Sequence, residues 1–195
     1  NYIPTDQLYV LSPDGQPINF KKARRFTRSE MMVMEMLSTN EWKRPMYFAT
    51  TIGSDYHLGL DPYLELTGMA YRITPTRSAD GRPRVNTEAM YDNMMNKFRY
   101  GNVNKPGIYL DENTLRMCRT HRMMFSELAE ALYEEGKHDK AIAVLDYAEE
   151  MLPGYNVSYD YTSASMAALY YTLGEMEKGN AIMDQVATNA VEYME

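Results

Sequence analysis

The sequence predicts a mainly α protein with a small mixed α/β part on its N-terminal side. Residues 1–85 contain short strand-forming runs that are separated by turn residues. From residue 86 onward, apolar residues recur at helical spacing, and a pattern of small and bulky residues appears twice. We therefore expect a mixed segment with short strands and one or two helices over residues 1–85, followed by a helical domain over residues 86–195.

The charge distribution divides the chain at the same place. Residues 1–85 hold 11 Lys and Arg against 9 Asp and Glu, whereas residues 86–195 hold 9 against 18. Because binding to nucleic acid requires a basic face, we expect no nucleic-acid partner for the acidic segment. No run of about 18 apolar residues is present, so we expect no membrane span in this sequence. The sequence begins with Asn1 rather than Met, which we interpret as a piece of a longer protein.

Short strands are predicted at two places in the first segment. Residues 8–11 and 18–20 flank the Asp14-Gly15 step, which favours a tight turn, so these runs should form a hairpin. Residues 45–51 and 69–73 are rich in strand-forming side chains. We expect the second two runs to pair with each other.

Two helix-start signals lie between these strands. Thr27 and Glu30 form the sequence of a capping box, in which each side chain bonds the backbone amide of the other residue. They predict a helix over about residues 28–38. The Asp61-Pro62 pair predicts a short helical turn over residues 61–66, with the aspartate as its cap.

After residue 86 the apolar period becomes that of a helix. One helix is expected over residues 87–99, and a second over residues 111–135, which Gly136 ends. The lone Cys118 falls on the apolar side of the second helix, where we expect a buried structural thiol. The other apolar positions of the two helices are Thr87, Met90, Tyr91, Met94, Met95 and Phe98, then Leu115, Phe125, Leu128 and Leu132.

The stretch FSELAEALYEEGKHDKAIAVLDYAEEMLPG, residues 125–154, resembles a tetratricopeptide repeat, a helix-turn-helix unit of about 34 residues. The resemblance implies antiparallel helical hairpins, with repeats at about residues 122–155 and 160–193. The positions that define the first repeat are Phe125, Leu128, Ala129, Leu132, Gly136, Ala141, Leu145, Ala148 and Pro153. A weaker second copy comprises Met166, Ala167, Tyr170, Gly174, Gly179, Met183 and Val186.

The stretch FATTIGSDYHLGL, residues 48–60, is the densest group of ligand-like side chains. With the tyrosine that follows it, the stretch supplies the candidate ligand contacts Asp55, Tyr56, His57 and Tyr63. A metal site would need Asp55, His57, Asp61 and Glu65 together, but their spacing matches no zinc or calcium motif. An exposed corner that bonds its own backbone is the favoured interpretation. We expect no metal, no cofactor and no catalytic residue here.

Residues 21–28, KKARRFTR, place five positive charges within eight positions. Beside a membrane, each charge near anionic head groups would contribute about 1 kcal/mol to binding. A solvated face, or pairing with the acidic half of the chain, is the favoured interpretation.

A family resemblance rests on three stretches: NEWKRPMYFATTIGSDYHLGLDPYLELTGMAYRITP, VNTEAMYDNMMNKFRYGN and IYLDENTLRM. They resemble the soluble C-terminal portion of large multipass membrane proteins of Bacteroidetes, a family of unknown function. The membrane half of that family is related to dolichol-phosphate-type GT-C glycosyltransferases and protein O-mannosyltransferases. The resemblance implies that the catalytic carboxylates belong to the membrane half and that this portion lies on the periplasmic side of the inner membrane.

Two functions remain open at this point. In the first, the chain is a non-catalytic extracytoplasmic interaction domain that binds a protein or peptide, or packs on the membrane domain of its own protein. In the second, it binds an acceptor or a glycan and contributes directly to protein O-glycosylation. Both place the chain near a membrane through the missing N-terminal region.

Overall fold

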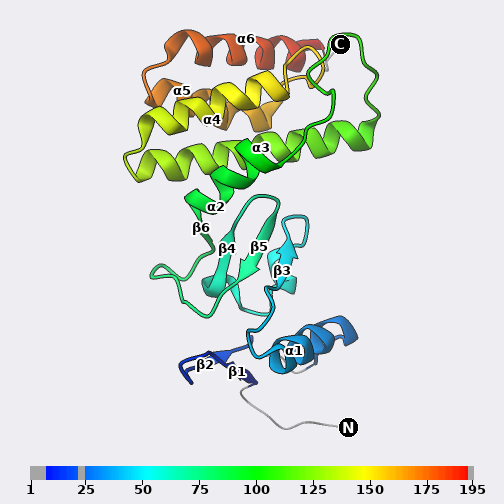
Figure 1. Cartoon of the computed structure of the whole chain (residues 1–195). Helices are drawn as coiled ribbons and strands as arrows, with labels where there is room; N and C mark the ends of the chain where they lie inside the picture. The colour runs from blue at the N-terminus through cyan, green and yellow to red at the C-terminus, as the bar shows by residue number, and fades with distance from the viewer. Residues whose placement is uncertain (1–7, 22–24, 193–195) are drawn as a thin grey trace. The chain divides into compact units, whose positions relative to one another are not determined.

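The computed structural model describes residues 8–21 and 25–192 of the chain. The chain forms two compact units, Asn1–Asn86 and Thr87–Glu195. The described residues form six α-helices and two small sheets, so the predicted class, mainly α with a small α/β part, is confirmed (Figure 1). None of the described helices is long and apolar enough to cross a bilayer.

The first unit begins with the predicted hairpin and helix. Strands β1 (Tyr9–Leu11) and β2 (Pro17–Asn19) pair antiparallel. Helix α1 (Arg28–Asn40) follows, and its capping box is complete: the Glu30 amide donates to Thr27 Oγ1 at 3.3 Å, and the Thr27 amide donates to Glu30 Oε2 at 2.7 Å. The capping-box prediction is therefore confirmed, and the helix runs two residues beyond the expected end.

A four-stranded sheet occupies the rest of this unit, in the order β3-β5-β4-β6. Strands β3 (Tyr47–Ala49) and β5 (Ala70–Ile73) pair antiparallel, as predicted. Strands β4 (Leu64–Leu66) and β6 (Arg84–Val85) were not predicted. The expected helical turn is only the 3-10 turn Asp61–Tyr63, because Leu64 and Leu66 are buried on one side of the sheet while Glu65 points elsewhere and pairs with Arg84. This is the two-residue period of a strand.

The core of the first unit lies between the hairpin, α1 and the sheet. It is a cluster of apolar side chains. Its buried members are Val10, Ile18, Phe20, Leu37, Phe48, Leu58, Leu60, Leu64 and Ile73. Two of them, Leu58 and Leu60, come from the connection between β3 and β4, so the predicted candidate stretch contributes directly to the core.

The second unit is helical throughout. The sequence predicted one regular helix over residues 87–99. The structure has helix α2 (Thr87–Tyr91) there, which continues into a π-helical turn (Asp92–Lys97). Met90 and Met94 of this element are fully buried. The long helix α3 (Glu112–Glu134) begins at Asp111, whose side chain accepts from the Thr114 amide. Cys118 is buried on its apolar side, as predicted.

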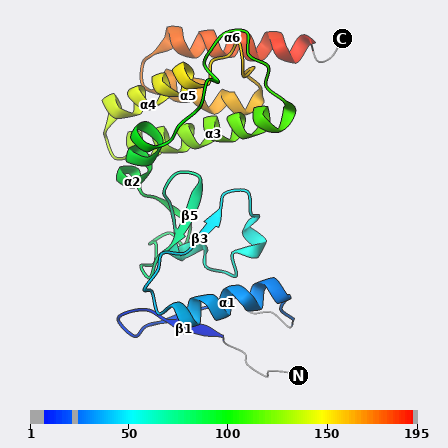
Figure 2. The ribbon, with the colours of Figure 1, turned by 45° about the vertical axis from the view of Figure 1, so that its right-hand side comes forward.

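Two helix pairs complete the second unit (Figure 2). Helix α3 packs on α4 (His138–Met151), and α5 (Ala164–Thr172) packs on α6 (Met176–Glu192). The turns of both pairs have the same geometry. Gly136 and Gly174 adopt positive φ angles of 74° and 86°. The amide after each glycine donates back to the carbonyl of Leu132 at 2.8 Å and of Tyr170 at 2.9 Å, which is the Schellman geometry.

The two pairs differ on the outer side of α6. Leu145 of α4 is fully buried, whereas Met183, at the matching position of α6, is exposed. Ile182 is the buried residue of α6 at this level, and its counterpart Val144 is also buried. The difference arises because α4 is followed by the α5–α6 pair, while no described helix packs on the outer face of α6.

Candidate functional site

The candidate residues Asp55 and Tyr56 lie in the 3-10 turn Ser54–Tyr56, which follows β3. Both side chains are exposed. The turn is anchored through its backbone, because the Asp55 carbonyl accepts a hydrogen bond from Lys21 Nζ at 2.8 Å. The predicted bonding of the Asp55 carboxylate to turn amides therefore stays a prediction, while the Asp55 and Tyr56 side chains are accessible to a ligand.

His57, by contrast, is 4% exposed. Its ring stacks on Phe48 at a centroid distance of 5.2 Å and meets the Tyr71 ring edge-on at 5.8 Å. Its Nδ1 lies 2.8 Å from Asp61 Oδ1, so Nδ1–H donates to the carboxylate and Nε2 carries the lone pair in the neutral ring. Nε2 is buried without a hydrogen-bond partner in the described part of the chain.

The structure corrects the role predicted for Asp61. It is the first residue of its 3-10 turn, not the cap, and no side chain caps that turn. Its carboxylate instead orients the imidazole of His57. Tyr63 is half-buried and packs against the core cluster. Of the four candidate residues, Asp55 and Tyr56 are therefore exposed, Tyr63 is half-buried and His57 is buried, and they do not line a common pocket among those found in the described residues.

The metal hypothesis also requires Glu65, and the structure directs that side chain away. Glu65 lies on β4, where its Oε1 accepts from Arg84 Nε at 3.0 Å, so it is engaged on the sheet rather than with the His57–Asp61 pair. Among the described residues, no group of three or more His, Cys, Asp or Glu side chains is arranged to hold a metal ion.

Backbone geometry explains why this stretch turns where it does. Leu58 and Gly59 adopt φ of 60° and 80°, the left-handed region. A Cβ at Gly59 would lie 3.0 Å from the Lys21 backbone nitrogen, and that amide donates to the Leu58 carbonyl at 2.6 Å. The corner is thus held by close backbone contact with residue 21, and the leucines on either side of Gly59 enter the core.

A second candidate site lies on the helical unit, and sequence reasoning did not find it. A hollow of about 310 Å³ opens between α3 and the start of α5. We call it the α3–α5 groove, and its lining residues are Met123, Ser126, Glu127, Glu130, Tyr161, Thr162 and Ser165.

The α3–α5 groove combines negative charge with exposed apolar groups. Glu127 and Glu130 lie one turn apart on α3, and neither carboxylate forms an ion pair within the described residues. Burial raises the pKa of Glu127, and the nearby Glu130 carboxylate raises it further. Tyr161 is 84% exposed, and Met123 is exposed beside the two carboxylates. An uncompensated acidic pair beside an accessible aromatic ring favours a cation with an apolar stem.

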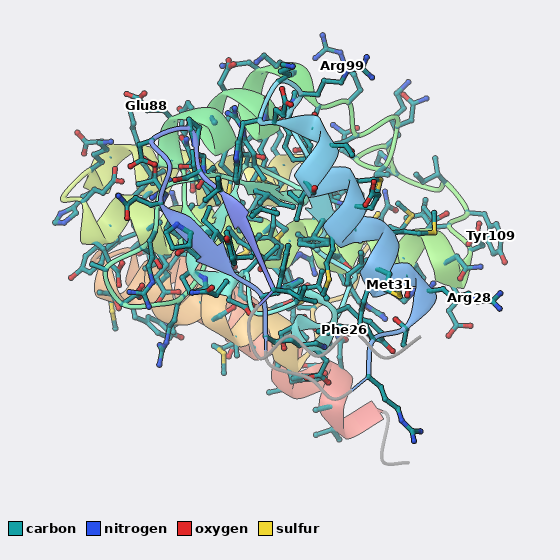
Figure 3. All side chains as sticks on the ribbon, turned by 90° about the horizontal axis from the view of Figure 1, so that it is seen from below. Phe26, Arg28, Met31, Glu88, Arg99 and Tyr109 are labelled. Atoms are coloured by element: carbon teal, nitrogen blue, oxygen red, sulfur yellow. The ribbon has the colours of Figure 1, made fainter. Side chains whose placement is uncertain are left out.

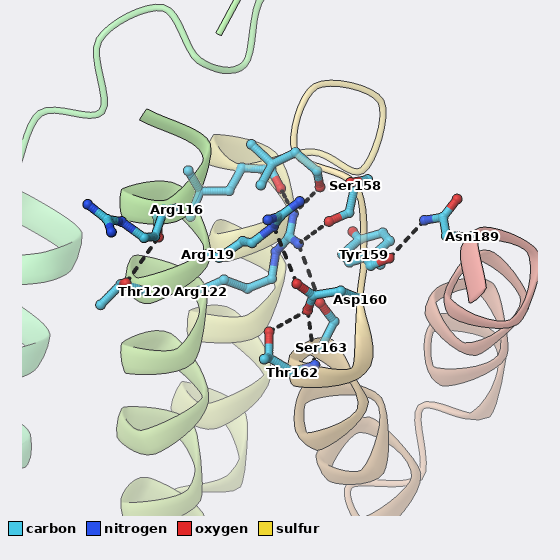
Figure 4. A network of polar contacts seen from close by, with 12 residues as sticks. Arg116, Arg119, Thr120, Arg122, Ser158, Tyr159, Asp160, Thr162, Ser163 and Asn189 are labelled. Atoms are coloured by element: carbon cyan, nitrogen blue, oxygen red, sulfur yellow. Dashed lines mark hydrogen bonds and ion pairs between the residues drawn. The ribbon is translucent and has the colours of Figure 1, made fainter. Parts of the chain in front are cut away.

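Arg122 holds the connection that carries Tyr161 and Thr162 of this groove, and Figure 4 shows its polar contacts. It is 2% exposed, and its guanidinium donates to the carbonyls of Leu152 at 2.6 Å and Val157 at 2.7 Å. It also lies 4.3 Å above the Tyr159 ring. These contacts fix the connection between α4 and α5, from which Tyr161 projects. The sequence signal was an arginine on the apolar stripe of α3, between Cys118 and Phe125.

Neighbouring side chains hold the same connection at its end. Arg119 Nε lies 3.3 Å from Asp160 Oδ2, and Asp160 caps the turn Tyr161–Ser163 by accepting from the Thr162 amide at 3.0 Å. The Arg122 guanidinium reaches the Ser163 hydroxyl at 3.4 Å. Tyr161 is therefore carried on a short turn whose cap, Asp160, and last residue, Ser163, both contact side chains of α3.

Comparison with known proteins adds one similarity. No curated protein and no solved structure matches the chain significantly. A family model described as TMEM260-associated domain 2 matches residues 6–95. The match covers the described part of the first unit and ends inside the π-helical turn of the second. The first unit is thus similar to a domain that the description of this family links to a membrane protein.

Proposed function

We propose that this chain is a non-catalytic binding module of a membrane-anchored protein, and that its helical unit receives a basic segment of a protein partner in the α3–α5 groove. The observation that carries the proposal is the acidic pair Glu127 and Glu130, which has no cationic partner among the described residues and lies beside exposed Met123 and Tyr161. A lysine or arginine of the partner would supply the missing charge, and its methylene stem would lie along the apolar groups.

The repeat character of the unit supports a groove on this side. The turns at Gly136 and Gly174 lie 38 residues apart and share their hydrogen bonds. Ala141 and Gly179, small and buried, follow each turn by the same interval. We infer that the pairs are tetratricopeptide-like repeats, with α3 and α5 as the first helices. Stacked repeats of this kind present an extended binding surface.

The size of the hollow limits what it can hold. About 310 Å³ is at the lower limit of small-ligand pockets, which begin near 300 Å³, so the groove fits one or two side chains rather than a folded domain. The partner is therefore an exposed segment that places a basic side chain between α3 and Tyr161. Such a contact suits a transient or tethered interaction.

The cellular setting belongs to the same proposal. Similarity to a TMEM260-associated domain supports attachment to a membrane protein. The resemblance to the C-terminal portion of GT-C-type multipass proteins supports a periplasmic setting, with any sugar-transfer chemistry supplied by the membrane half. The basic segment would then belong either to a protein substrate or to the membrane domain of the same protein.

The test is peptide binding by the whole chain, measured by fluorescence anisotropy with a Lys/Arg-rich peptide and an acidic peptide of equal length. We expect the basic peptide to bind more tightly, and Glu127→Gln/Glu130→Gln to weaken it about tenfold or more, since each lost charge contact is worth about 1 kcal/mol. Glu150→Gln/Glu177→Gln, a matched pair of exposed glutamates, should leave affinity unchanged. Equal affinity of both double variants would contradict the proposal.

The same interaction should depend on pH. Because burial raises the pKa of Glu127 above 4.5, this carboxylate takes up a proton earlier than an ordinary glutamate as pH falls. Protonation removes the charge that the peptide needs. Affinity should therefore fall with decreasing pH while the fold, followed by circular dichroism, is still intact.

A glycan- or acceptor-binding role remains the second candidate, because Asp55 and Tyr56 are both exposed on one short turn. A tyrosine ring beside a carboxylate suits a sugar ring and its hydroxyl groups. A glycan array probed with the chain and with Tyr56→Ala distinguishes the two candidates. Glycan binding that depends on Tyr56 but not on Glu127 would favour this second role.

A further inference from the structure

Helix α1 carries an apolar face that the first unit does not cover. One side of the helix packs into the core through Leu37, with Val33 and Met34 against the same cluster. On the other side Met31, Met32 and Met36 are 52%, 64% and 49% exposed. We call these three residues the methionine face. In Figure 3, Met31 and Arg28 extend from the first turn of α1.

The charges around the methionine face are mainly positive. Residues 21–44 contain seven Lys and Arg against three Glu. Lys21 is paired with Glu30 at 2.7 Å, and Lys43 with Glu41 at 2.5 Å. The exposed side chains of Arg25, Arg28 and Arg44 form no ion pair within the described residues. Glu35 is the exposed carboxylate of α1 itself.

Arginines near both ends of an exposed apolar helix face define what can cover it. Methionine side chains are long, unbranched and flexible, so they enter an irregular apolar layer without requiring a complementary shape. Arginines at the edges of such a face can reach phosphate groups while the methionines enter the acyl boundary. We propose that the methionine face is a lipid-docking surface, on which α1 lies in the plane of an anionic bilayer.

The similarity to a membrane-protein-associated domain is consistent with this surface, because a tethered domain meets the bilayer at high local concentration. A helix of 13 residues with three exposed methionines provides only weak and reversible insertion by itself. Docking would orient the first unit on the membrane. It does not depend on the α3–α5 groove, which belongs to the second unit.

The experiment is flotation of the whole chain with vesicles of phosphatidylcholine alone or with about 30% phosphatidylglycerol. We expect binding to the anionic vesicles only, and loss of it in high salt. Arg25→Gln and Arg28→Gln should each lower partitioning about fivefold. Met32→Ser/Met36→Ser should lower it about tenfold, since less apolar surface enters the bilayer. Arg77→Gln/Arg82→Gln, at exposed positions of the same unit, is the matched control.

Loss of vesicle binding could also result from misfolding, so the experiment includes a variant that is expected to bind the anionic vesicles more tightly. Glu35→Lys removes the exposed carboxylate of α1 and adds a cation, so it should raise partitioning several-fold. No binding to anionic vesicles would overturn the proposal. Binding that is unchanged in the methionine variants would also overturn it. The same holds if soluble polyglutamate, at equal concentration, abolishes the binding of wild type and of Met32→Ser/Met36→Ser alike, because the surface would then recognise an acidic protein.

Discussion

A buried guanidinium such as that of Arg122 is stable only when carbonyl oxygens replace the water that it loses. In this chain the carbonyls of Leu152, Val157 and Ser158 do so, and the Tyr159 ring covers one face. Desolvation lowers the pKa of Arg122, and the contacts with Tyr159 and Asp160 oppose that shift. Arg122 therefore stabilises an irregular connection by supplying hydrogen-bond donors to its buried carbonyl oxygens.

Replacing Arg122 with Met should be strongly destabilising, because it keeps the apolar stem and leaves the carbonyl oxygens buried without donors. Hydrogen bonds to charged groups contribute about 1.5–3 kcal/mol each, so we expect a loss of about 3 kcal/mol in the free energy of unfolding. Arg122→Lys should recover only part of it, because an ammonium cannot reach carbonyls on two sides. Arg116→Met, on the exposed side of α3, is the control in urea denaturation. Equal effects at 116 and 122 would contradict this role.

Glu30 makes the first unit sensitive to acid. The hydrogen bond with Lys21, and next those with Thr27, lower the pKa of Glu30 from 4.5 to about 2. Because the pKa is depressed in the folded state, the stabilisation is complete above about pH 5 and is lost as pH falls towards 2. Glu30→Gln should flatten this part of the stability–pH curve, whereas Glu35→Gln should not. Curves of the same shape for wild type and Glu30→Gln would exclude the mechanism.

At the scale of elements, the second unit depends on close approach of helices. Ala129, Ala141 and Ala148 are all fully buried in the α3–α4 pair. Such contacts leave no room for larger side chains, because protein interiors are packed at crystal-like density. The two glycine turns set the same reversal in each pair.

Ala141→Leu should therefore destabilise the helical unit by about 1–3 kcal/mol through overpacking. Ala143 lies two residues further on the exposed side of α4, so Ala143→Leu should change stability by less than about 0.5 kcal/mol. Thermal unfolding of both variants measures the difference. An unchanged midpoint for Ala141→Leu would contradict the close helix contact.

Elements with local signals could be predicted from the sequence. The hairpin at Asp14-Gly15, the capping box at Thr27 and the helix end at Gly136 each depend on a few neighbouring residues, and each is present. Strands β4 and β6 were missed because they are short and pair across 19 residues, from Glu65 to Arg84. Short strands have little local pattern, and their pairing partners decide them.

The candidate sites also differ in how much of them could be predicted from the sequence. The sequence identified the residues of the β3–β4 corner but not that His57 would be buried and paired with Asp61, because the burial of His57 depends on Phe48 of β3 and Tyr71 of β5. The α3–α5 groove joins Glu127 to Tyr161, which lie far apart in the chain. The local sequence signal near this groove is Arg122, an arginine on the apolar face of α3.

At the scale of the whole molecule, each unit has its own buried core. That of the first unit consists of residues between Val10 and Ile73. The second unit buries its own side chains, from Met90 to Ile182. The match to the family model ends at residue 95 and therefore does not coincide with the boundary between the two units, which lies after Asn86.

This disagreement yields a test of where the helical unit begins. Helix α2 packs on α3, the Thr87 hydroxyl donates to Glu135 at 2.9 Å, and Met90 and Met94 are fully buried. Residues 87–195 produced alone should therefore give a cooperative helical unfolding transition. Residues 96–195, cut after the end of the family match, lack both methionines. Burial of each is worth about 1.5–3 kcal/mol, so this shorter fragment should unfold at markedly lower urea concentration. If the two fragments are equally stable, α2 is not part of the helical core, and the structural boundary belongs nearer residue 95.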